Sequence, residues 1–289
     1  MGRKSSKVYK EIMKISIITI NYNNCEGLRR TIESVVNQTC RDFEYIIIDG
    51  GSTDGSVDVI KHYADNIDYW VSEPDKGIYN AMNKGVAVSK GEYCLFMNSG
   101  DCLYSNSVIG DVLSQGLDAD VVAGSVVYIN GEINESPKNI TFDTFYFGGW
   151  VNHEASFIKK EIMIRFPYDE NYRIVSDWKF FIEAIVLNNA TYRQIDRVIC
   201  LYDLTGISTV NTELRTKEKE QVFKELIPDR IMNDYDKFHG KNDDFHRLMF
   251  TLTQMKARKA IYSVIVFLLK IIMLNRGWVK TFPIKSRDL

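Results

Sequence analysis

The residues with the clearest capacity for chemistry follow an apolar stretch in the first half of the chain. Tyr93–Met97 has the length and composition of a buried strand, and it is followed at once by Asn98, Ser99, Gly100 and Asp101. In an open α/β sheet, ligands bind beyond the carboxyl ends of the strands. A carboxylate there, beside a glycine that lets the backbone approach closely, can hold a hard divalent cation and through it a phosphate. The same residues also suit a surface turn, so the surrounding elements must decide between the two interpretations.

Strand-like and helix-like segments alternate over the first hundred residues. Runs rich in β-branched and aromatic residues predict strands, and apolar residues at helical spacing predict helices between them. The predicted strands are Ile15–Ile20, Phe43–Ile48, Ile67–Val71 and Tyr93–Met97. This alternation predicts an α/β fold with a mostly parallel sheet flanked by helices. The loops after the four strands then fall at one edge of the sheet and are rich in Asn, Asp, Ser and Gly, which together indicate a polar ligand site.

Beyond Asp101 the predicted elements are shorter. The aromatic stretch Phe142–Trp150 contains two adjacent glycines and suits a loop or lid beside a pocket. Ser176–Leu187 predicts a helix, with Ser176 as its N-cap and Asp177 in its first turn. Further short segments are a helix at Val108–Leu113 and strands at Val121–Ala123, Val126–Ile129, Ser156–Ile158, Tyr192–Ile195 and Val198–Tyr202.

Composition limits the class of protein. The 289 residues carry a formal net charge of −2 and 45% hydrophobic residues, an ordinary globular composition that gives no reason to expect a nucleic-acid partner. The five scattered cysteines, without a C-x-x-C pair, fit a reducing cytosol better than a disulfide scaffold. We expect a flexible leader over residues 1–13, a main domain over residues 14–205 and a helical C-terminal extension over residues 206–289.

The C-terminal extension contains one strongly apolar segment, Ala260–Leu274, flanked by basic residues. It is shorter than the ~20 residues that span a bilayer. Two hypotheses remain open: a helix packed on the main domain, or an interfacial helix on an anionic membrane. The second hypothesis would place a cytoplasmic protein on the inner-membrane surface.

Five stretches carry recognisable motifs. They are Ser16–Asn23 (S-I-I-T-I-N-Y-N), Ile47–Ser56 (I-I-D-G-G-S-T-D-G-S), Ser72–Gly85 (S-E-P-D-K-G-I-Y-N-A-M-N-K-G), Phe96–Asp101 (F-M-N-S-G-D) and Ser176–Phe181 (S-D-W-K-F-F). With these motifs the chain resembles the family 2 glycosyltransferases, nucleotide-diphospho-sugar transferases of the GT-A fold. It is most similar to bacterial enzymes that build exopolysaccharide, capsule or lipopolysaccharide. The resemblance implies an inverting, metal-dependent hexosyltransferase that uses a nucleotide-sugar, with UDP expected, and a hydroxyl of a glycan or lipid-linked acceptor.

The resemblance also implies where the donor binds. Ile20, Asn21 and Tyr22 would contact the nucleoside, and Asp49 matches the carboxylate that accepts a hydrogen bond from uracil N–H. Asp49 could instead cap the following helix, and Lys76 could be an ordinary solvated lysine. Glycines allow close approach of a ligand, and the start of the helix predicted over Ile78–Val88, the third helix, favours anions. The remaining donor-binding residues implied are Gly50, Gly51, Ser52, Lys76, Gly77, Asn80, Asn83, Asn98, Ser99 and Gly100.

The metal motif departs from the D-x-D pattern of most family members, because Asn98-Ser99-Gly100-Asp101 offers one carboxylate. The resemblance assigns the cation, Mn²⁺ or Mg²⁺, to Asp101, with His153 as a second contact. A site with a single carboxylate should bind the cation more weakly than one with two. For His153, a structural role is the alternative.

The resemblance assigns the catalytic base to Asp177, which would take the proton from the attacking acceptor hydroxyl. Glu154 and Trp178 would contact the acceptor. A helix-capping role for Asp177 is compatible with this one, because both favour a carboxylate at a helix N-terminus.

Three other function classes are alternatives to a glycosyltransferase. A nucleotidyltransferase would be expected to carry a Gly-rich, basic phosphate loop after the first strand, where Asn21-Tyr22-Asn23-Asn24 stands. A dinucleotide-dependent oxidoreductase needs G-x-G-x-x-G, which the chain lacks at the corresponding loops. A catalytically weak or inactive sugar-nucleotide-binding protein stays open because of the reduced metal motif.

Overall fold

The computed structural model describes residues 14–203, 211–238, 260–261, 263–265 and 267–268. The predicted leader, residues 1–13, and most of the apolar segment Ala260–Leu274 lie outside the described residues. The chain divides into a first unit, Met1–Leu226, and a second unit, Ile227–Leu289. The second unit contains helix α10, Asp229–Phe238. No helix in the described part of the chain combines the length and apolarity that a bilayer crossing requires.

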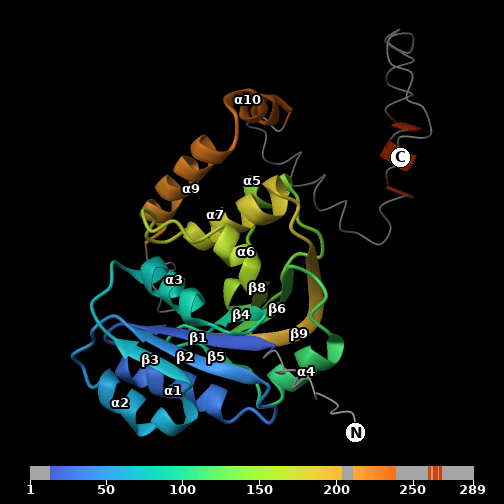
Figure 1. Cartoon of the computed structure of the whole chain (residues 1–289). Helices are drawn as coiled ribbons and strands as arrows, with labels where there is room; N and C mark the ends of the chain where they lie inside the picture. Colours follow the sequence, from blue (N-terminus) through green and yellow to red (C-terminus); the bar gives the residue numbers. More distant parts are fainter. Residues whose placement is uncertain (1–13, 204–210, 239–259, 262, 266, 269–289) are drawn as a thin grey trace, which may run out of the picture. The chain divides into compact units, whose positions relative to one another are not determined.

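A nine-stranded sheet forms the centre of the first unit (Figure 1). The spatial order is β3-β2-β1-β4-β8-β6-β9-β5, with β7 paired to β6. Strands β3, β2, β1 and β4 are parallel to one another, whereas β8 runs antiparallel between β4 and β6. The predicted mostly parallel α/β sheet is therefore confirmed. The strands are β1 Ile15–Asn21, β2 Phe43–Asp49, β3 Tyr69–Ser72, β4 Tyr93–Phe96, β5 Cys102–Leu103, β6 Val121–Tyr128, β7 Ile133–Asn134, β8 Ser156–Lys159 and β9 Tyr192–Tyr202.

Helices cover both faces of this sheet, with α1 and α2 on one side and α3, α6 and α7 on the other (Figure 1). Along β1, Ile17 packs in the core with Leu28 of α1, and the next residue, Ile18, packs in the opposite core with Met82 of α3. All seven residues of β1 are buried and four of them are isoleucines, as expected for a strand that is covered on both faces. The helices are α1 Cys25–Val36, α2 Ser56–His62, α3 Ile78–Val88, α4 Val108–Gln115, α5 Phe142–Tyr146, α6 Lys160–Arg165, α7 Ser176–Phe181 and α9 Thr212–Leu226.

Two pairs of predicted strands were wrong, because each pair forms a single continuous strand. Val121–Tyr128 is one strand rather than two, and so is Tyr192–Tyr202. The register between β6 and β9 shifts on both sides of Ser125, as at a β-bulge, and pairing continues beyond it. Gly124 permits it, because a Cβ there would lie 2.5 Å from a side-chain carbon of Ile199 and 2.6 Å from the Arg197 carbonyl oxygen. Gly124, which the sequence pattern left between two predicted strands, is thus the point where β6 and β9 approach each other closely.

Two further local predictions need correction. The aromatic stretch predicted as a loop or lid begins with helix α5, where Thr141 and Thr144 form a capping box. Ser176 is the first residue of α7 and not its N-cap, which is Val175. The helix predicted over Ser176–Leu187 is α-helical only to Phe181 and continues as a π-helical turn over Ile182–Leu187.

Helix α9 belongs to the first unit. Val222 is fully buried in the core cluster that also contains Phe180 and Phe181 of α7, and Phe223 packs edge-to-face on Trp178 with ring centroids 5.1 Å apart. The first unit, which includes α9, ends at Leu226. This packing brings a charged helix of the C-terminal region to the edge of the site described next.

Candidate active site

A cavity of about 780 Å³ lies at the carboxyl ends of the four parallel strands. The loops after β1, β2, β3 and β4 all contribute to its wall, as the strand alternation predicted for their common edge. Residues from the far half of the sheet, beyond β8, complete it. The lining residues used below are Ile20, Asn21, Tyr22, Gly50, Lys76, Gly77, Tyr79, Asn98, Ser99, Asp101, His153, Glu154, Asp177 and Asp203.

Asp49 lies behind this wall and is fully buried. Its Oδ1 accepts hydrogen bonds from Asn21 Nδ2 (2.7 Å) and Ser52 Oγ (2.6 Å), and its Oδ2 accepts from Ser72 Oγ (2.6 Å) and the backbone N–H groups of Gly51 and Ser52 (3.2 and 2.9 Å). Burial raises the pKa of Asp49, but these hydrogen bonds outweigh it and leave the pKa below its ordinary value. The structure does not place the carboxylate at the cavity surface, so a base could reach it only by replacing one of these donors.

Asn21 stands between Asp49 and the cavity. Its amide nitrogen is used by Asp49 and by Ser52 (3.2 Å), whereas its Oδ1 is buried and has no hydrogen-bond partner among the described residues. Tyr22 next to it is 67% exposed at the cavity rim. The β1 loop therefore presents an unused acceptor and an exposed aromatic ring to the same space.

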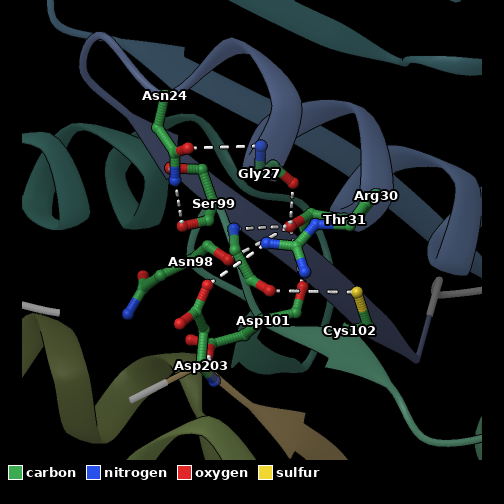
Figure 2. Close-up of polar contacts among 10 residues, drawn as sticks. Asn24, Gly27, Arg30, Thr31, Asn98, Ser99, Asp101, Cys102 and Asp203 are labelled. Atoms are coloured by element: carbon green, nitrogen blue, oxygen red, sulfur yellow. Dashed lines mark hydrogen bonds and ion pairs between the residues drawn. The ribbon is translucent and has the colours of Figure 1, made fainter. Parts of the chain in front are cut away.

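The loop after β4 is held by helix α1 and by Asn24, the N-cap of that helix (Figure 2). The buried hydroxyl of Thr31 donates to the Asp101 carbonyl oxygen at 2.7 Å and accepts from the Gly100 N–H at 3.0 Å. Asn24 Nδ2 donates to the Ser99 carbonyl oxygen at 3.0 Å. Gly100 has φ +113°, which strongly favours glycine over residues with a Cβ. The turn is thus fixed, and the Asp101 side chain is directed to the cavity.

Asp203, at the end of β9, lies directly against Asp101. Its backbone N–H donates to Asp101 Oδ1 at 2.8 Å, and its Oδ2 accepts from Arg30 at 3.2 Å (Figure 2). Burial in the first place, and then the charge of Glu154, raise the pKa of Asp101 well above its ordinary value. Burial, with the charge of Asp177 adding to it, raises the pKa of Glu154 to about 7. Burial and mutual repulsion therefore make the charged forms of these carboxyl groups unfavourable in the protein alone.

These oxygen groups suit a hard divalent cation that shares its coordination with a diphosphate. Asn98 Oδ1, also buried and without a partner among the described residues, adds a carbonyl-type oxygen beside Asp101. Within the described part of the chain, no three His, Cys, Asp or Glu side chains converge closely enough to hold a metal without other ligands. The residues fit a cation that arrives with its substrate and not a preformed all-protein site.

His153 is almost fully buried beneath the cavity. Its ring stacks on Phe96 with centroids 5.0 Å apart, and its Nε2 is hydrogen-bonded to the Tyr168 hydroxyl at 2.6 Å. Burial lowers its pKa, so the imidazole is neutral near pH 7. Any metal bond from His153 would therefore come from Nδ1 or would require the Tyr168 hydrogen bond to break.

Asp177 lines the large cavity and also a second one of about 470 Å³. The Tyr79 hydroxyl donates to its Oδ1 at 2.8 Å. Burial first, and the charge of Asp177 second, raise the pKa of Tyr79 well above its ordinary value, which keeps the phenol protonated as a donor. Glu154 lines both cavities as well, and Trp178 lines the smaller one, where its Nε1 donates to the Gly149 carbonyl oxygen.

The third-helix residues divide into two groups. Lys76 and Gly77 line the large cavity. Asn80 and Asn83 do not: Asn80 Nδ2 donates to Glu170 at 2.9 Å, and Asn83 bonds both the N–H and the carbonyl oxygen of Tyr168. These two asparagines tie α3 to the loop before α7. Gly51, Ser52 and Gly100 are likewise absent from the cavity lining and shape the loops that form it.

Sequence reasoning missed three residues of the site or of its support, Asp203, Tyr79 and Glu218. Asp203 follows a strand whose end was predicted, but nothing in the sequence places it against Asp101. Tyr79 lies inside the third motif, but nothing in the sequence places its hydroxyl against Asp177. Glu218 sits on a charged helix and reads as solvent-exposed. It is buried instead, and accepts from the backbone N–H groups of Arg173, Ile174 and Val175 at 2.8, 2.9 and 3.2 Å.

Comparison with known proteins adds the family. The model of "Glycosyl transferase family 2" matches residues 16–185, more than half of the chain. An uncharacterised glycosyltransferase of Mycobacterium tuberculosis is 33% identical over 208 residues, which cover 68% of this chain and 77% of the relative.

Solved structures are similar at lower identity. The structure of S. aureus TarS 1-349 in complex with UDP-GlcNAc has a TM-score of 0.62 and 17% identity, with 74% of this chain and 65% of that one covered. The chain spans 39% of the longer TarS chain that it also matches. The mannosyltransferase PcManGT from Pyrobaculum calidifontis, in complex with GDP-Man and Mn²⁺, has a TM-score of 0.60 and 14% identity, with 92% and 83% covered. These likenesses show the GT-A fold.

Proposed function

Because the chain belongs to glycosyl transferase family 2, we propose that it transfers a sugar from a UDP-sugar to a hydroxyl of a glycan or lipid-linked acceptor. We propose inversion at the anomeric carbon and a role in cell-surface polysaccharide synthesis. One observation carries the proposal: the carboxylate of Asp177 lies where two cavities meet. A base at such a junction can reach an acceptor in one cavity while a donor occupies the other.

The nucleotide would bind at the β1 and β2 loops. The exposed ring of Tyr22 offers a face for the base, and Asn21 Oδ1 is an acceptor without a protein partner. We therefore place the hydrogen bond to the base N–H at Asn21, with Asp49 fixing the orientation of the Asn21 amide. Gly50 lines the cavity without a side chain, and a Cβ there would fall 2.6 Å from the Asp75 carboxylate. Lys76 would add positive charge near the diphosphate.

Asp101 would hold the divalent cation, with Asn98, Ser99 and the diphosphate providing further oxygen ligands. The neutral imidazole of His153 is the proposed second side-chain contact. A bound cation would stabilise the negative charge that develops on the leaving diphosphate. The raised pKa of Asp101, caused mainly by burial and by Glu154, supports this proposal because a cation would favour the charged carboxylate.

Asp177 would accept the proton of the attacking hydroxyl on the face of the sugar opposite the nucleotide. The Tyr79 hydroxyl holds one carboxylate oxygen and leaves the other to the acceptor. A single displacement then inverts the anomeric centre. Glu154 and Trp178 would contact the acceptor from the smaller cavity.

We also propose that residues 260–274 bind the membrane surface peripherally, where a lipid-linked acceptor would be found. The apolar composition and the basic flanks of this segment support that proposal.

A ligand screen tests the donor proposal. A ligand that binds only the folded protein raises the melting temperature. We expect UDP and one UDP-sugar to do so with Mn²⁺ present, and GDP-Man to have less effect. Asp101→Asn should remove the Mn²⁺-dependent part of the shift, whereas the matched control Asp58→Asn, at an exposed position on α2, should keep it. An unchanged Mn²⁺ effect in Asp101→Asn would remove Asp101 from the site.

Turnover with the same UDP-sugar then separates an enzyme from a sugar-nucleotide-binding protein. The product's anomeric configuration, read by NMR, should be opposite to that of the donor. Retention would contradict the single displacement.

A further inference from the structure

We propose that the smaller cavity is an acceptor site built for a sugar that carries an anionic group, a carboxylate or a phosphate, close to the hydroxyl that is glycosylated. This inference rests on the proposed function, because it takes the larger cavity as the donor site. It goes further by naming the chemical class of the acceptor. The argument uses the walls of the smaller cavity, the distribution of charge around it and the packing of α9.

The walls of the smaller cavity are aromatic. Trp150, Trp178, Tyr128 and Tyr202 all line it, and its volume of about 470 Å³ is within the range of small-molecule sites. Trp150 is 49% exposed, so part of its ring is open to a ligand. The cavity shares Glu154 and Asp177 with the donor cavity. A sugar placed here has apolar faces to pack on and a carboxylate at one end.

Charge is divided across the cavity. The acidic groups, Glu154 and Asp177, lie on the side shared with the donor cavity. Two basic residues, Arg215 and Lys219, line the smaller cavity and not the larger one. They stand four residues apart on α9 and therefore on one face of the helix. An acceptor would thus meet a base at its reacting end and two cations at the other.

Lys219 is half-buried, and its Nζ lies 4.7 Å from the centroid of the Trp178 ring. Among the described residues, no carboxylate forms an ion pair with Lys219. Burial first, and repulsion by Arg215 second, lower its pKa, while the charge of Asp177 acts in the opposite direction. A partly buried ammonium group without an ion pair is unfavourable unless an anion joins it. A bound carboxylate or phosphate would supply that anion.

Glu218 keeps these cations in place. Its buried carboxylate bonds three consecutive backbone N–H groups just before α7, which fixes this turn of α9 against the segment that carries Asp177. These hydrogen bonds link the helix turn that carries the cations to the segment that precedes the proposed base. By contrast, Lys217 on the same helix is 71% exposed and pairs with Glu213. It provides a matched control for the loss of a positive charge.

The test measures binding without chemistry. The full chain is saturated with UDP and Mn²⁺, and three probes are titrated by isothermal calorimetry or ligand-observed NMR: methyl glucoside, methyl glucuronide and methyl glucoside 6-phosphate. We expect at least one charged probe to bind on the order of ten-fold more tightly than the neutral one, as one charged contact of ~1.4 kcal/mol would give. Comparison of the two charged probes separates a carboxylate acceptor from a phosphate acceptor.

Lys219→Gln and Arg215→Gln should each reduce this preference, and Lys217→Gln should keep it. Equal binding of all three probes, or a preference that survives both substitutions at Arg215 and Lys219, would overturn the inference while UDP binding stands. Absence of UDP binding would instead count against the proposed function. UDP affinity should be unchanged in all three variants, which separates loss of the site from loss of folding.

Discussion

At the scale of single residues, the site depends on polar groups that are used by the protein before any ligand arrives. Asp49 receives five hydrogen bonds, from the last residues of β1 and β3 and from the loop after β2. Removal of a buried acceptor with so many donors lowers the stability of the fold, because each donor left without a partner keeps its desolvation penalty. The carboxylate that the motif marked as a ligand contact is thus also a structural centre for the β1, β2 and β3 loops.

Replacement of Asp49 tests this structural role. Asp49→Asn turns one acceptor atom into a donor that faces other donors. We expect a loss of about 1–3 kcal/mol in the free energy of unfolding and weaker UDP binding, because the Asn21 amide loses its anchor. Urea denaturation and calorimetric titration measure the two effects. The exposed control Asp58→Asn should change neither by much, and a fully stable Asp49→Asn variant would contradict the structural role.

The lowered pKa of Asp49 determines how the stability difference between the wild type and Asp49→Asn depends on pH. Burial opposes the ionised form, but the hydrogen bonds from Ser52, Ser72 and Asn21 favour it more. A lowered carboxyl pKa contributes stability that is present above the unfolded value of about 3.9 and is lost as the pH falls through the folded value. The stability gap between the wild type and Asp49→Asn should therefore be constant from pH 7 to about 5 and shrink below about pH 4. A gap that widens on acidification would be the wrong sign.

Replacement of Tyr79 tests the hydrogen bond that Asp177, the proposed base, accepts. Tyr79→Phe removes the hydroxyl that donates to Asp177 at 2.8 Å and keeps the ring in the core. We expect UDP affinity to stay the same and kcat to fall by roughly ten-fold, the value of a hydrogen bond of ~1.4 kcal/mol. The control Tyr63→Phe, which removes a hydroxyl bonded to Glu33 on the other face of the sheet, should leave kcat unchanged. An equal effect of both variants would mean that the loss is not specific to Asp177.

At the scale of elements, helix α9 is a structural part of the site. Glu218→Gln should weaken the three backbone hydrogen bonds before α7 and destabilise the first unit by about 1–3 kcal/mol. Because Asp177 follows this segment, kcat should fall more than UDP affinity. The control Glu220→Gln, exposed on the same helix, should affect neither quantity. Urea denaturation and steady-state kinetics of the two variants make the comparison, and equal behaviour would place Glu218 outside the support of the site.

Elements near the N-terminus could be predicted from the sequence because local pattern and tertiary role agree there. The run from Ile15 to Ile20 is buried on both faces, and its high isoleucine content predicts a buried strand. Near Gly124 they disagree: the glycine marks a close approach to Ile199 within a continuous strand. The residues that join distant parts of the site, Asp203 and Glu218, could not be predicted, because their partners are set by packing over more than 40 residues of separation.

At the scale of the whole molecule, the two units predict where the chain can be shortened. A chain that ends at Leu226 keeps the sheet, both cavities and α9. We expect it to fold and to bind UDP as the full chain does. A chain that ends at Asn211 lacks Glu218 and Val222 and should lose stability. Equal melting temperatures of the two shortened chains would contradict the place given to α9.

The shortened chain also tests the proposed membrane contact. If residues 260–274 bind anionic lipid, the full chain should sediment with vesicles that contain phosphatidylglycerol, and the chain ending at Leu226 should stay in the supernatant. High salt should weaken the binding of the full chain. Vesicle binding by the shortened chain would place the contact elsewhere.

The central claim is that Asp177, at the junction of the two cavities, removes the acceptor proton. The most direct measurement compares the wild type with Asp177→Asn, using one donor and one acceptor, by UDP-sugar titration and by the transfer rate at saturation. Asparagine keeps the size of the side chain but cannot take a proton at neutral pH. The account predicts an unchanged donor affinity and a transfer rate lower by roughly two to four orders of magnitude, the usual contribution of a general base. A variant that loses donor affinity but keeps its transfer rate would contradict it.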